Sequence, residues 1–155
     1  MTDRADLFNR LQGCVRDTVN GSLDRDEKLK IICTMLRDGV EHYDWVGFYV
    51  ADADKEELVL GPFAGEPTEH VRIPFGRGIC GQAAAASKTV VAQDVTDEDN
   101  YLSCSPRVQS EIAVPILKHE RFVGELDIDS HTISPFTEED VRFLEEVCRM
   151  VSELF

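Results

Sequence analysis

Two of the five cysteines stand in sequence contexts that favour a reactive thiol. Cys80 follows a glycine-spaced stretch at the start of a predicted helix, where unpaired backbone N–H groups and the helix dipole favour a thiolate. Cys104 lies in a polar segment between Ser103 and Ser105. Each thiol alone is equally typical of an incidental exposed cysteine. If the segment around Cys104 meets the helix start, the two thiols can act as a nucleophile and its resolving partner.

The other three cysteines fall on apolar stripes of predicted helices, where a free cysteine packs as a small hydrophobic residue; they are Cys14, Cys33 and Cys148. The odd total and the lack of a Cys-x-x-Cys pair argue against a disulfide framework. Neither the cysteines nor the histidines have metal-ligand spacing, so we expect no zinc or haem site. The histidines are His42, His70, His119 and His131.

Three carboxylates form a second candidate group. Asp127 and Asp129 alternate within the strand-like segment 125–130, so their side chains are expected on the same face. Glu111 begins a neighbouring apolar segment that can place it beside them. Three carboxylates on one face of an apolar hairpin repel one another unless a cation or a proton is bound there. We therefore interpret this group as functional rather than as part of a solvated surface.

Hydrophobic periodicity predicts the elements that must position these residues. The first forty residues have the apolar spacing of two helices, and Thr137 is the predicted N-cap of another at the C-terminus. Strand-like composition occurs in the segments 45–50, 57–60, 71–73, 88–92, 110–117 and 121–128. We expect one domain, 1–155, of the α/β (α+β) class, with a mainly antiparallel central sheet of about six strands flanked by N- and C-terminal helices. The polar connection 94–107 has a length that is often functional.

Composition excludes several classes of partner. The chain has 155 residues and a formal net charge of −14, and this negative field opposes binding to nucleic acid or to an anionic membrane. No apolar run approaches the roughly 20 residues that a membrane-spanning helix needs. The N-terminal residues lack the apolar core of a signal peptide. We therefore expect a cytoplasmic protein.

Several motifs occur here in the same order as in a known family. They are Trp45-x-Gly-Phe-Tyr49, Leu60-Gly-Pro-Phe63, Ile73-Pro-Phe-Gly-Arg-Gly-Ile-Cys-Gly81, Cys104, Ser110-Glu-Ile112, Val114-Pro115 and Leu126-Asp-Ile-Asp-Ser130. Together they resemble the free methionine-(R)-sulfoxide reductases, which have the GAF fold. The resemblance covers nearly the whole chain from Trp45 onward. It implies a GAF-like enzyme that reduces free L-methionine-(R)-sulfoxide to L-methionine.

The resemblance also implies a role for each candidate residue. Cys104 matches the nucleophile, which would pass through a sulfenic acid to a disulfide, and Cys80 matches a cysteine that can resolve it. The residues that would hold the substrate are Trp45, Tyr49, Glu111, Asp127 and Asp129. Many members of the family have a further cysteine at the position of His70, so this chain departs from them in its resolving thiols.

Partners follow from the same resemblance. An external dithiol such as thioredoxin would regenerate the enzyme, and no bound cofactor is expected. The terminal helices could pair between subunits as in many GAF domains, which predicts a homodimer, unless they only cover the sheet; the residues available for this are Leu7, Leu11, Val151 and Leu154. The alternative functions are a regulatory GAF module that binds a small ligand without turnover and a plain dimerisation domain.

Overall fold

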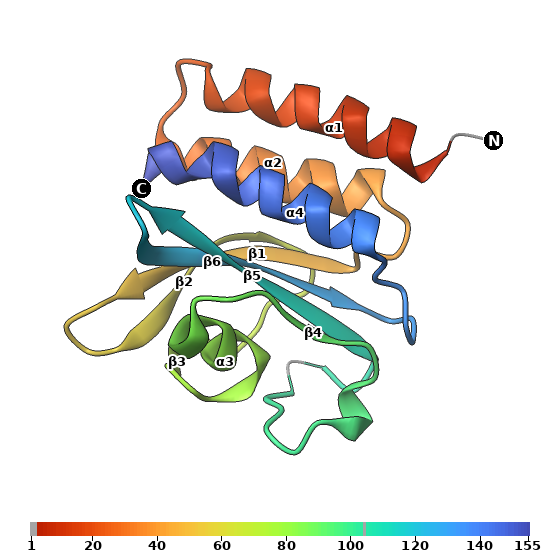
Figure 1. The fold of residues 1–155 in the computed structure, drawn as a ribbon, viewed down its shortest axis with the longest axis vertical. Helices are drawn as coiled ribbons and strands as arrows, with labels where there is room; N and C mark the ends of the chain where they lie inside the picture. Colours follow the sequence, from red (N-terminus) through yellow and green to blue (C-terminus); the bar gives the residue numbers. More distant parts are fainter. Residues whose placement is uncertain (1–2, 104) are drawn as a thin grey trace.

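A six-stranded sheet forms the centre of the molecule in a computed structural model that describes residues 3–103 and 105–155. Its spatial order is β3-β2-β1-β6-β5-β4, and all neighbouring strands are antiparallel (Figure 1). The strands are β1 (Trp45–Asp52), β2 (Glu57–Ala64), β3 (Arg72–Pro74), β4 (Val90–Ala92), β5 (Ser110–Lys118) and β6 (Arg121–Ser130). This confirms the predicted α+β class and the mainly antiparallel sheet.

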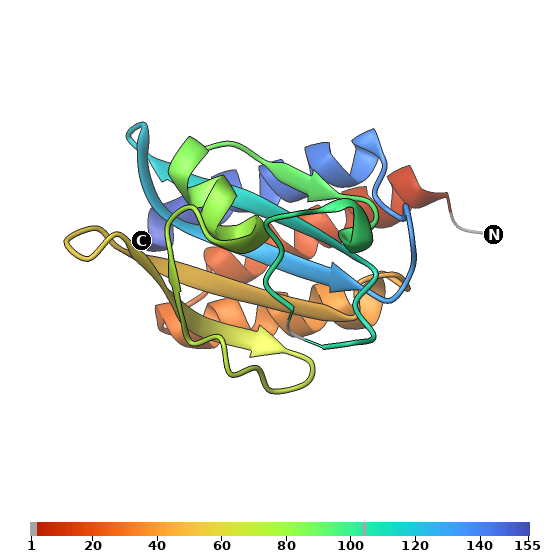
Figure 2. The same ribbon diagram turned by 90° about the horizontal axis from the view of Figure 1, so that it is seen from below.

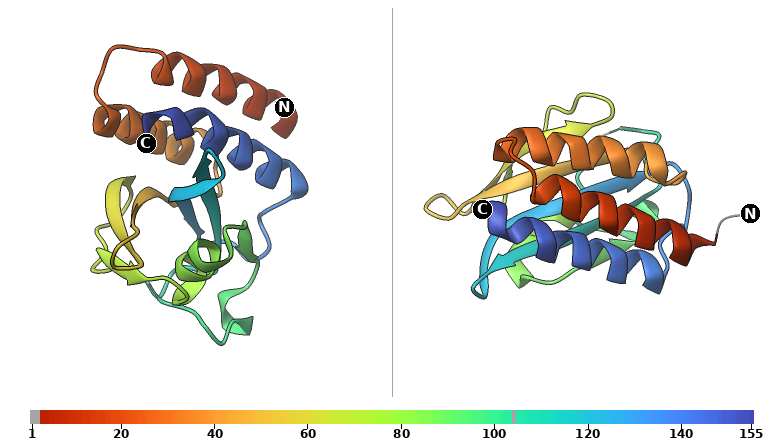
Figure 3. Two further views of the ribbon diagram at one scale, coloured as in Figure 1. Left: turned by 60° about the vertical axis from the view of Figure 1, so that its left-hand side comes forward. Right: turned by 90° about the horizontal axis from the view of Figure 1, so that it is seen from above.

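Three helices cover one face of the sheet: α1 (Arg4–Val19), α2 (Arg25–Gly39) and α4 (Glu138–Val151). In Figure 3, α2 and α4 lie next to the sheet and α1 packs over them from outside. The side chain of Asp24 caps α2, and Thr137 and Asp140 form the predicted N-terminal capping box of α4. Buried aliphatic and aromatic side chains of these helices meet the sheet residues Val46, Phe48 and Ile112, forming the larger core.

The opposite face is covered by less regular structure. It carries α3 (Gly78–Ala86) and the segment that connects β4 to β5, including the short 3-10 helix η1 (Val95–Asp97), as seen from below in Figure 2. A second apolar cluster, with Ile79, Ala83 and Val108, lies between these elements and the sheet. A 3-10 turn, η2 (Ser152–Leu154), follows α4.

Strand β2 continues through Gly61 and Pro62, beyond the predicted segment 57–60. The register between β1 and β2 shifts between Gly47 and Tyr49, which marks a β-bulge opposite this pair. A Cβ on Gly61 would lie 3.1 Å from the carbonyl oxygen of Phe48, and proline is tolerated at a bulge because no ladder N–H is needed there. The strand therefore bends rather than ends.

The predicted core cysteines divide into two groups. Cys33 and Cys148 are buried as predicted, but Cys14 is exposed and that prediction is wrong. The buried side of α1 is formed by Phe8, Leu11, Val15 and Val19, and position 14 lies outside this stripe. Within residues 3–103 and 105–155, no helix combines the length and apolarity that crossing a membrane requires.

Candidate active site

The acidic residues gather on the face of the sheet that α3 covers. Strand β6 pairs with β5 so that Glu111 stands opposite Asp129, and Asp127 is two residues away on the same face. Strand β1 places Trp45 opposite Asp129 on the other side. The structure therefore brings together the predicted carboxylates and the tryptophan in adjacent rows of one face.

A fourth carboxylate, Glu125, belongs to the same group and was not among the predicted site residues. It precedes Asp127 by two positions, pairs with Tyr49 across the β1–β6 ladder, and is completely buried. The alternation that identified Asp127 and Asp129 would also have identified Glu125. Neither carboxylate oxygen of Glu125 has a hydrogen-bond partner among the described residues, and the same is true of one oxygen each of Asp127 and Asp129.

The carboxyl groups are buried together, and this changes their acidity. Burial raises the pKa of Glu125, Asp127 and Asp129, and the charge of Asp127 raises it further at Glu125 and Asp129. At Asp127, hydrogen bonds with Glu111 and Cys80 oppose the rise. A buried cluster of this kind is stable only when protons or a cation offset its charge.

Cys80 faces this cluster instead of solvent. Its side chain is buried, and its thiol lies 3.4 Å from a carboxylate oxygen of Glu111. Burial and the charges of Asp127, Glu125 and Glu111 raise its pKa well above the usual thiol range. The thiolate that the helix start was expected to favour is therefore not stabilised at Cys80, because burial and the nearby carboxylates both disfavour the charged form.

The side chain of Asn100 binds the backbone at the start of α3. The Gly78 N–H donates to the Asn100 side-chain oxygen at 2.9 Å, and the Asn100 amide donates to the Gly76 carbonyl at 2.7 Å. Gly78 has a φ of +69°, and a Cβ there would lie 2.8 Å from Cβ of Leu102. The glycine-spaced stretch thus allows the polar connection to pack against the helix start.

The indole of Trp45 is seated by two glycines. A Cβ on Gly47 would lie 2.3 Å from Cη2 of the ring, and a Cβ on Gly65 would lie 2.6 Å from its Cδ1. The indole also stacks on Phe63, with ring centroids 5.5 Å apart, and its N–H donates to the Glu66 carbonyl at 2.9 Å. The spacing Trp-x-Gly therefore has a packing reason, since the indole lies over the side-chain-free position opposite Asp127.

Tyr49 and His70 link the sheet to the polar connection. The Tyr49 hydroxyl donates to the His70 carbonyl at 3.1 Å, and the His70 ring Nε2 lies 2.7 Å from the Ser103 carbonyl oxygen. The departure from the family motif at His70 thus falls beside the residue that precedes Cys104. Cys104 itself, the predicted nucleophile, lies outside the described residues.

Two cavities adjoin the cluster. One of about 150 Å³ is lined by Trp45 and Asp129 from the sheet and by loop residues that include Ser105 and Arg107. A smaller one of about 10 Å³ is lined by Tyr49, Cys80, Glu111 and Asp127, among others. The described neighbours of Cys104 therefore border the larger cavity, and the buried thiol and carboxylates border the smaller one.

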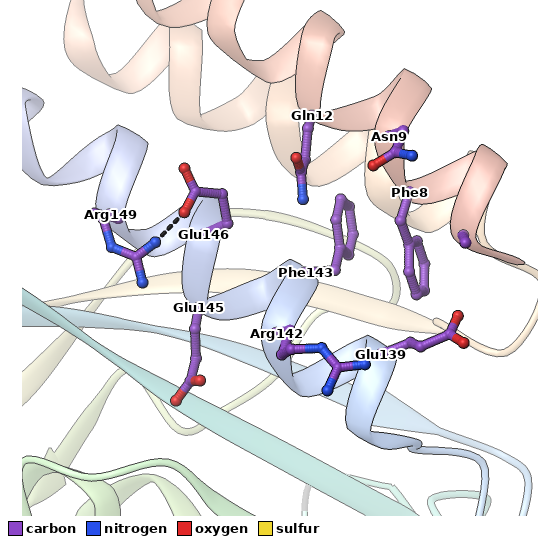
Figure 4. A pocket seen from close by; sticks show the side chains of 10 residues that line it. Phe8, Asn9, Gln12, Glu139, Arg142, Phe143, Glu145, Glu146 and Arg149 are labelled. Carbon is purple, nitrogen blue, oxygen red and sulfur yellow. Dashed lines mark hydrogen bonds and ion pairs between the residues drawn. The ribbon is translucent and has the colours of Figure 1, made fainter.

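A third, larger groove of about 540 Å³ lies on the helical side of the molecule, between α1 and α4 (Figure 4). Phe8 and Phe143 stack at its base, with ring centroids 4.2 Å apart, and an ion pair joins Glu146 and Arg149 at its edge. None of the predicted acidic and aromatic site residues lines this groove. This groove is separated from the acidic cluster by the sheet.

Comparison with known proteins agrees with the fold. Residues 24–154 match the model of the GAF domain family. The chain is 36% identical to the free methionine-R-sulfoxide reductase of Escherichia coli over 77% of this chain and 71% of the relative. It is 38% identical to GAF domain-containing protein A of Dictyostelium discoideum, over 96% of this chain and 92% of that protein.

A solved structure gives the same result. The free methionine-R-sulfoxide reductase of Neisseria meningitidis, in complex with its substrate, superposes with a TM-score of 0.94 and 36% identity, covering 100% of this chain and 92% of that one. These matches confirm the family resemblance drawn from the motifs. The chain belongs to the GAF domain family and, within it, to the free methionine-R-sulfoxide reductases.

Proposed function

We propose that this protein reduces free L-methionine-(R)-sulfoxide to L-methionine with a cysteine thiolate. The observation that carries the proposal is the buried carboxylate group of Glu111, Asp127 and Asp129 beside Trp45, in a chain whose relatives include reductases with this activity. An ordinary sheet does not bury several carboxylates on one apolar face, so this arrangement requires a ligand or a proton.

The thiolate of Cys104 attacks the sulfoxide sulfur and forms an S–S bond, while a carboxyl group of the cluster protonates the sulfoxide oxygen. The resulting OH group then moves from the substrate sulfur to the sulfur of Cys104 as the S–O and S–S bonds to the substrate break. Methionine is released, and Cys104 is left as a sulfenic acid. The acid must be neutral when it acts, and burial raises the pKa values of Asp127 and Asp129 in that direction.

The same cluster explains a preference for the free amino acid. An ammonium group entering the cavity beside Asp129 offsets carboxylate charge that is otherwise uncompensated. A methionine sulfoxide residue inside a peptide lacks this ammonium. Trp45, held rigidly between Gly47 and Gly65, supplies an apolar wall for the methyl-sulfinyl end of the substrate.

We propose further that Cys80 resolves the sulfenic acid and that a thioredoxin-like dithiol then reduces the disulfide. The sulfenic acid would condense with the Cys80 thiol to a disulfide and water. The raised pKa of Cys80 predicts a slow step, since the thiolate is the attacking species. After one equivalent of substrate and alkylation of free thiols, peptide mapping should find a Cys80–Cys104 disulfide; Cys104 bonded elsewhere, or present only as sulfenic acid, excludes this resolver.

The proposed activity is tested by coupling NADPH oxidation through thioredoxin reductase and thioredoxin to the separate (R) and (S) epimers of free methionine sulfoxide. We expect turnover with the free (R) epimer and little with the (S) epimer or with N-acetyl methionine sulfoxide amide. Tight binding of methionine sulfoxide without methionine formation, even with a chemical dithiol, would instead support the regulatory module.

We also propose a cytoplasmic homodimer, although two of the four residues suggested for subunit pairing are already used within the chain. Leu11 and Val151 are buried in the core of one subunit. An interface through α1 and α4 would instead use the groove at Phe8 and Phe143, whose charged edge has both signs and suits a two-fold contact. Light scattering at micromolar concentration should give twice the mass of the 17.4 kDa chain, and a monomer would reject it.

A further inference from the structure

One thiol and two carboxylates in the interior have the spacing of metal ligands. One ligand atom each from Cys80, Glu111 and Asp127 lies within 4.8 Å of the others, and all three residues are buried. The sulfur of Cys80 and the nearest oxygen of Glu111 are 3.4 Å apart. Adjacent ligands of a tetrahedral zinc ion are separated by about 3.5 Å, given zinc–sulfur and zinc–oxygen bonds of about 2.3 and 2.1 Å.

A second observation concerns buried carboxylate oxygens of Asp127 and of the neighbouring Glu125. One oxygen of Asp127 and both oxygens of Glu125, all completely buried, have no hydrogen-bond partner among the described residues. Glu125 is on the same face of β6 as Asp127, and its charge acts on Cys80.

We propose that Cys80, Glu111 and Asp127 form a binding site for a borderline divalent cation, with Zn²⁺ as its best ligand, and that Glu125 faces the remaining coordination position. The three ligands come from α3, β5 and β6 and are separated by 31 and 16 positions, so no sequence spacing indicates the site. The adjoining cavity of about 10 Å³ has room for about one water molecule, which suits a dehydrated ion.

The donor set selects among metals. A thiolate with two or three carboxylates suits Zn²⁺, which takes sulfur and oxygen ligands in a four-coordinate site. Ca²⁺ and Mg²⁺ require six or more oxygen ligands or retained waters, and the small enclosed cavity does not accommodate these. The site should therefore discriminate strongly between Zn²⁺ and Mg²⁺.

Occupation of this site has a consequence for catalysis that rests on the proposed function. Glu111 and Asp127 are also assigned to the substrate, so Zn²⁺ and methionine sulfoxide should exclude one another. Zn²⁺ would then act as an inhibitor competitive with substrate, reversed by a chelator. Because binding of the ion is measured without turnover, failure of the metal site and failure of the proposed activity can be told apart.

The direct test titrates fully reduced protein with Zn²⁺ against a chromophoric chelator, with Mg²⁺ as the comparison ion. We expect one tightly bound Zn²⁺ per chain. Cys80→Ser should weaken it by more than about tenfold, since losing even a group that only orients a ligand costs 10–100-fold in affinity. The matched control is Cys14→Ser, which removes an exposed thiol on the helical side and should leave the affinity unchanged.

Cobalt spectroscopy identifies the ligands independently of affinity. Co²⁺ bound to wild-type protein should show a thiolate-to-metal charge-transfer band that persists in Cys14→Ser and Cys104→Ser and disappears in Cys80→Ser. Thermal melting verifies that each variant is folded, and Asp127→Asn provides a second ligand variant. The proposal is overturned if Cys80→Ser retains the band, if loss of Cys104 alone removes it, or if Mg²⁺ binds as tightly as Zn²⁺.

Discussion

Asp140 connects three parts of the chain, and its replacement by Asn should destabilise the whole fold. Its buried carboxylate accepts hydrogen bonds from the Tyr43 hydroxyl at 2.7 Å and from the Thr137 N–H at 2.9 Å. It also contacts Arg4 of α1 and the ring Nε2 of His42, both at 3.0 Å. These contacts tie α1 and α4 to the segment that leads into β1.

The magnitude follows from the acidity of this carboxyl group. Hydrogen bonds from His42, Tyr43 and Thr137 outweigh the opposing effect of burial and lower its pKa from 3.8 to about 2. At about 1.4 kcal/mol per pKa unit, its ionisation contributes on the order of 2 kcal/mol to the free energy of unfolding at neutral pH. In Asp140→Asn the amide NH₂ also replaces an oxygen, so it faces donors that can no longer be satisfied.

The lowered pKa of Asp140 also sets the direction in which the free energy of unfolding changes with pH. Because the folded pKa lies below the unfolded one, the contribution is complete above about pH 4 and is lost as the pH falls toward 2. Urea denaturation should show Asp140→Asn less stable by about 2 kcal/mol at pH 7, with a smaller difference at pH 3. Asp17→Asn, an exposed acid on α1, should change stability by less than about 0.5 kcal/mol. A difference at pH 3 as large as at pH 7 would refute this account of Asp140.

Three further predictions concern the site. Cys104→Ser should abolish methionine formation in a single turnover while far-UV circular dichroism is unchanged; retained reduction would exclude this nucleophile. Asp127→Asn should lower kcat/KM by about 10- to 100-fold, since a buried charge-assisted hydrogen bond contributes about 1–3 kcal/mol, and an unchanged kcat/KM would make Asp127 structural. Gly47→Ala should displace the indole of Trp45, because the added Cβ lies 2.3 Å from the ring, and cost about 1–3 kcal/mol. Trp45 is the sole tryptophan, so its fluorescence reports the displacement, and an unshifted emission spectrum would contradict this packing.

Local rules were sufficient for the strands and for most of the acidic cluster. Alternation within 125–130 placed Asp127 and Asp129 on one face of the strand. The short connection between β5 and β6 restricts the register of this pair, so Glu111 was expected beside them. The same alternation, extended by two residues toward the N-terminus, would have included Glu125. The N-terminal cap of α4 could also be predicted from the sequence, because a capping box is formed by side chains three positions apart.

Exposure of the cysteines could not be predicted from periodicity alone. A helical stripe gives the direction of the buried face, but its width depends on the neighbours that cover it. On α1 the buried stripe runs through Leu11 and Val15 and leaves Cys14 in solvent, whereas α2 and α4 lie against the sheet and bury Cys33 and Cys148.

The ordered motifs were enough to identify the family. Spacing along one or two adjacent strands was enough to predict the strand faces and the acidic group. The burial of Cys80 and the position of His70, in contrast, depend on how distant segments pack together. The start of α3 lies over β5 and β6, so the Cys80 thiol is buried there beside carboxylates more than thirty positions away along the chain. Burial and the charges of these carboxylates raise its pKa. His70 meets Ser103 across a similar separation. Electrostatic effects act through space and burial, and neither is encoded in the local sequence around these two residues.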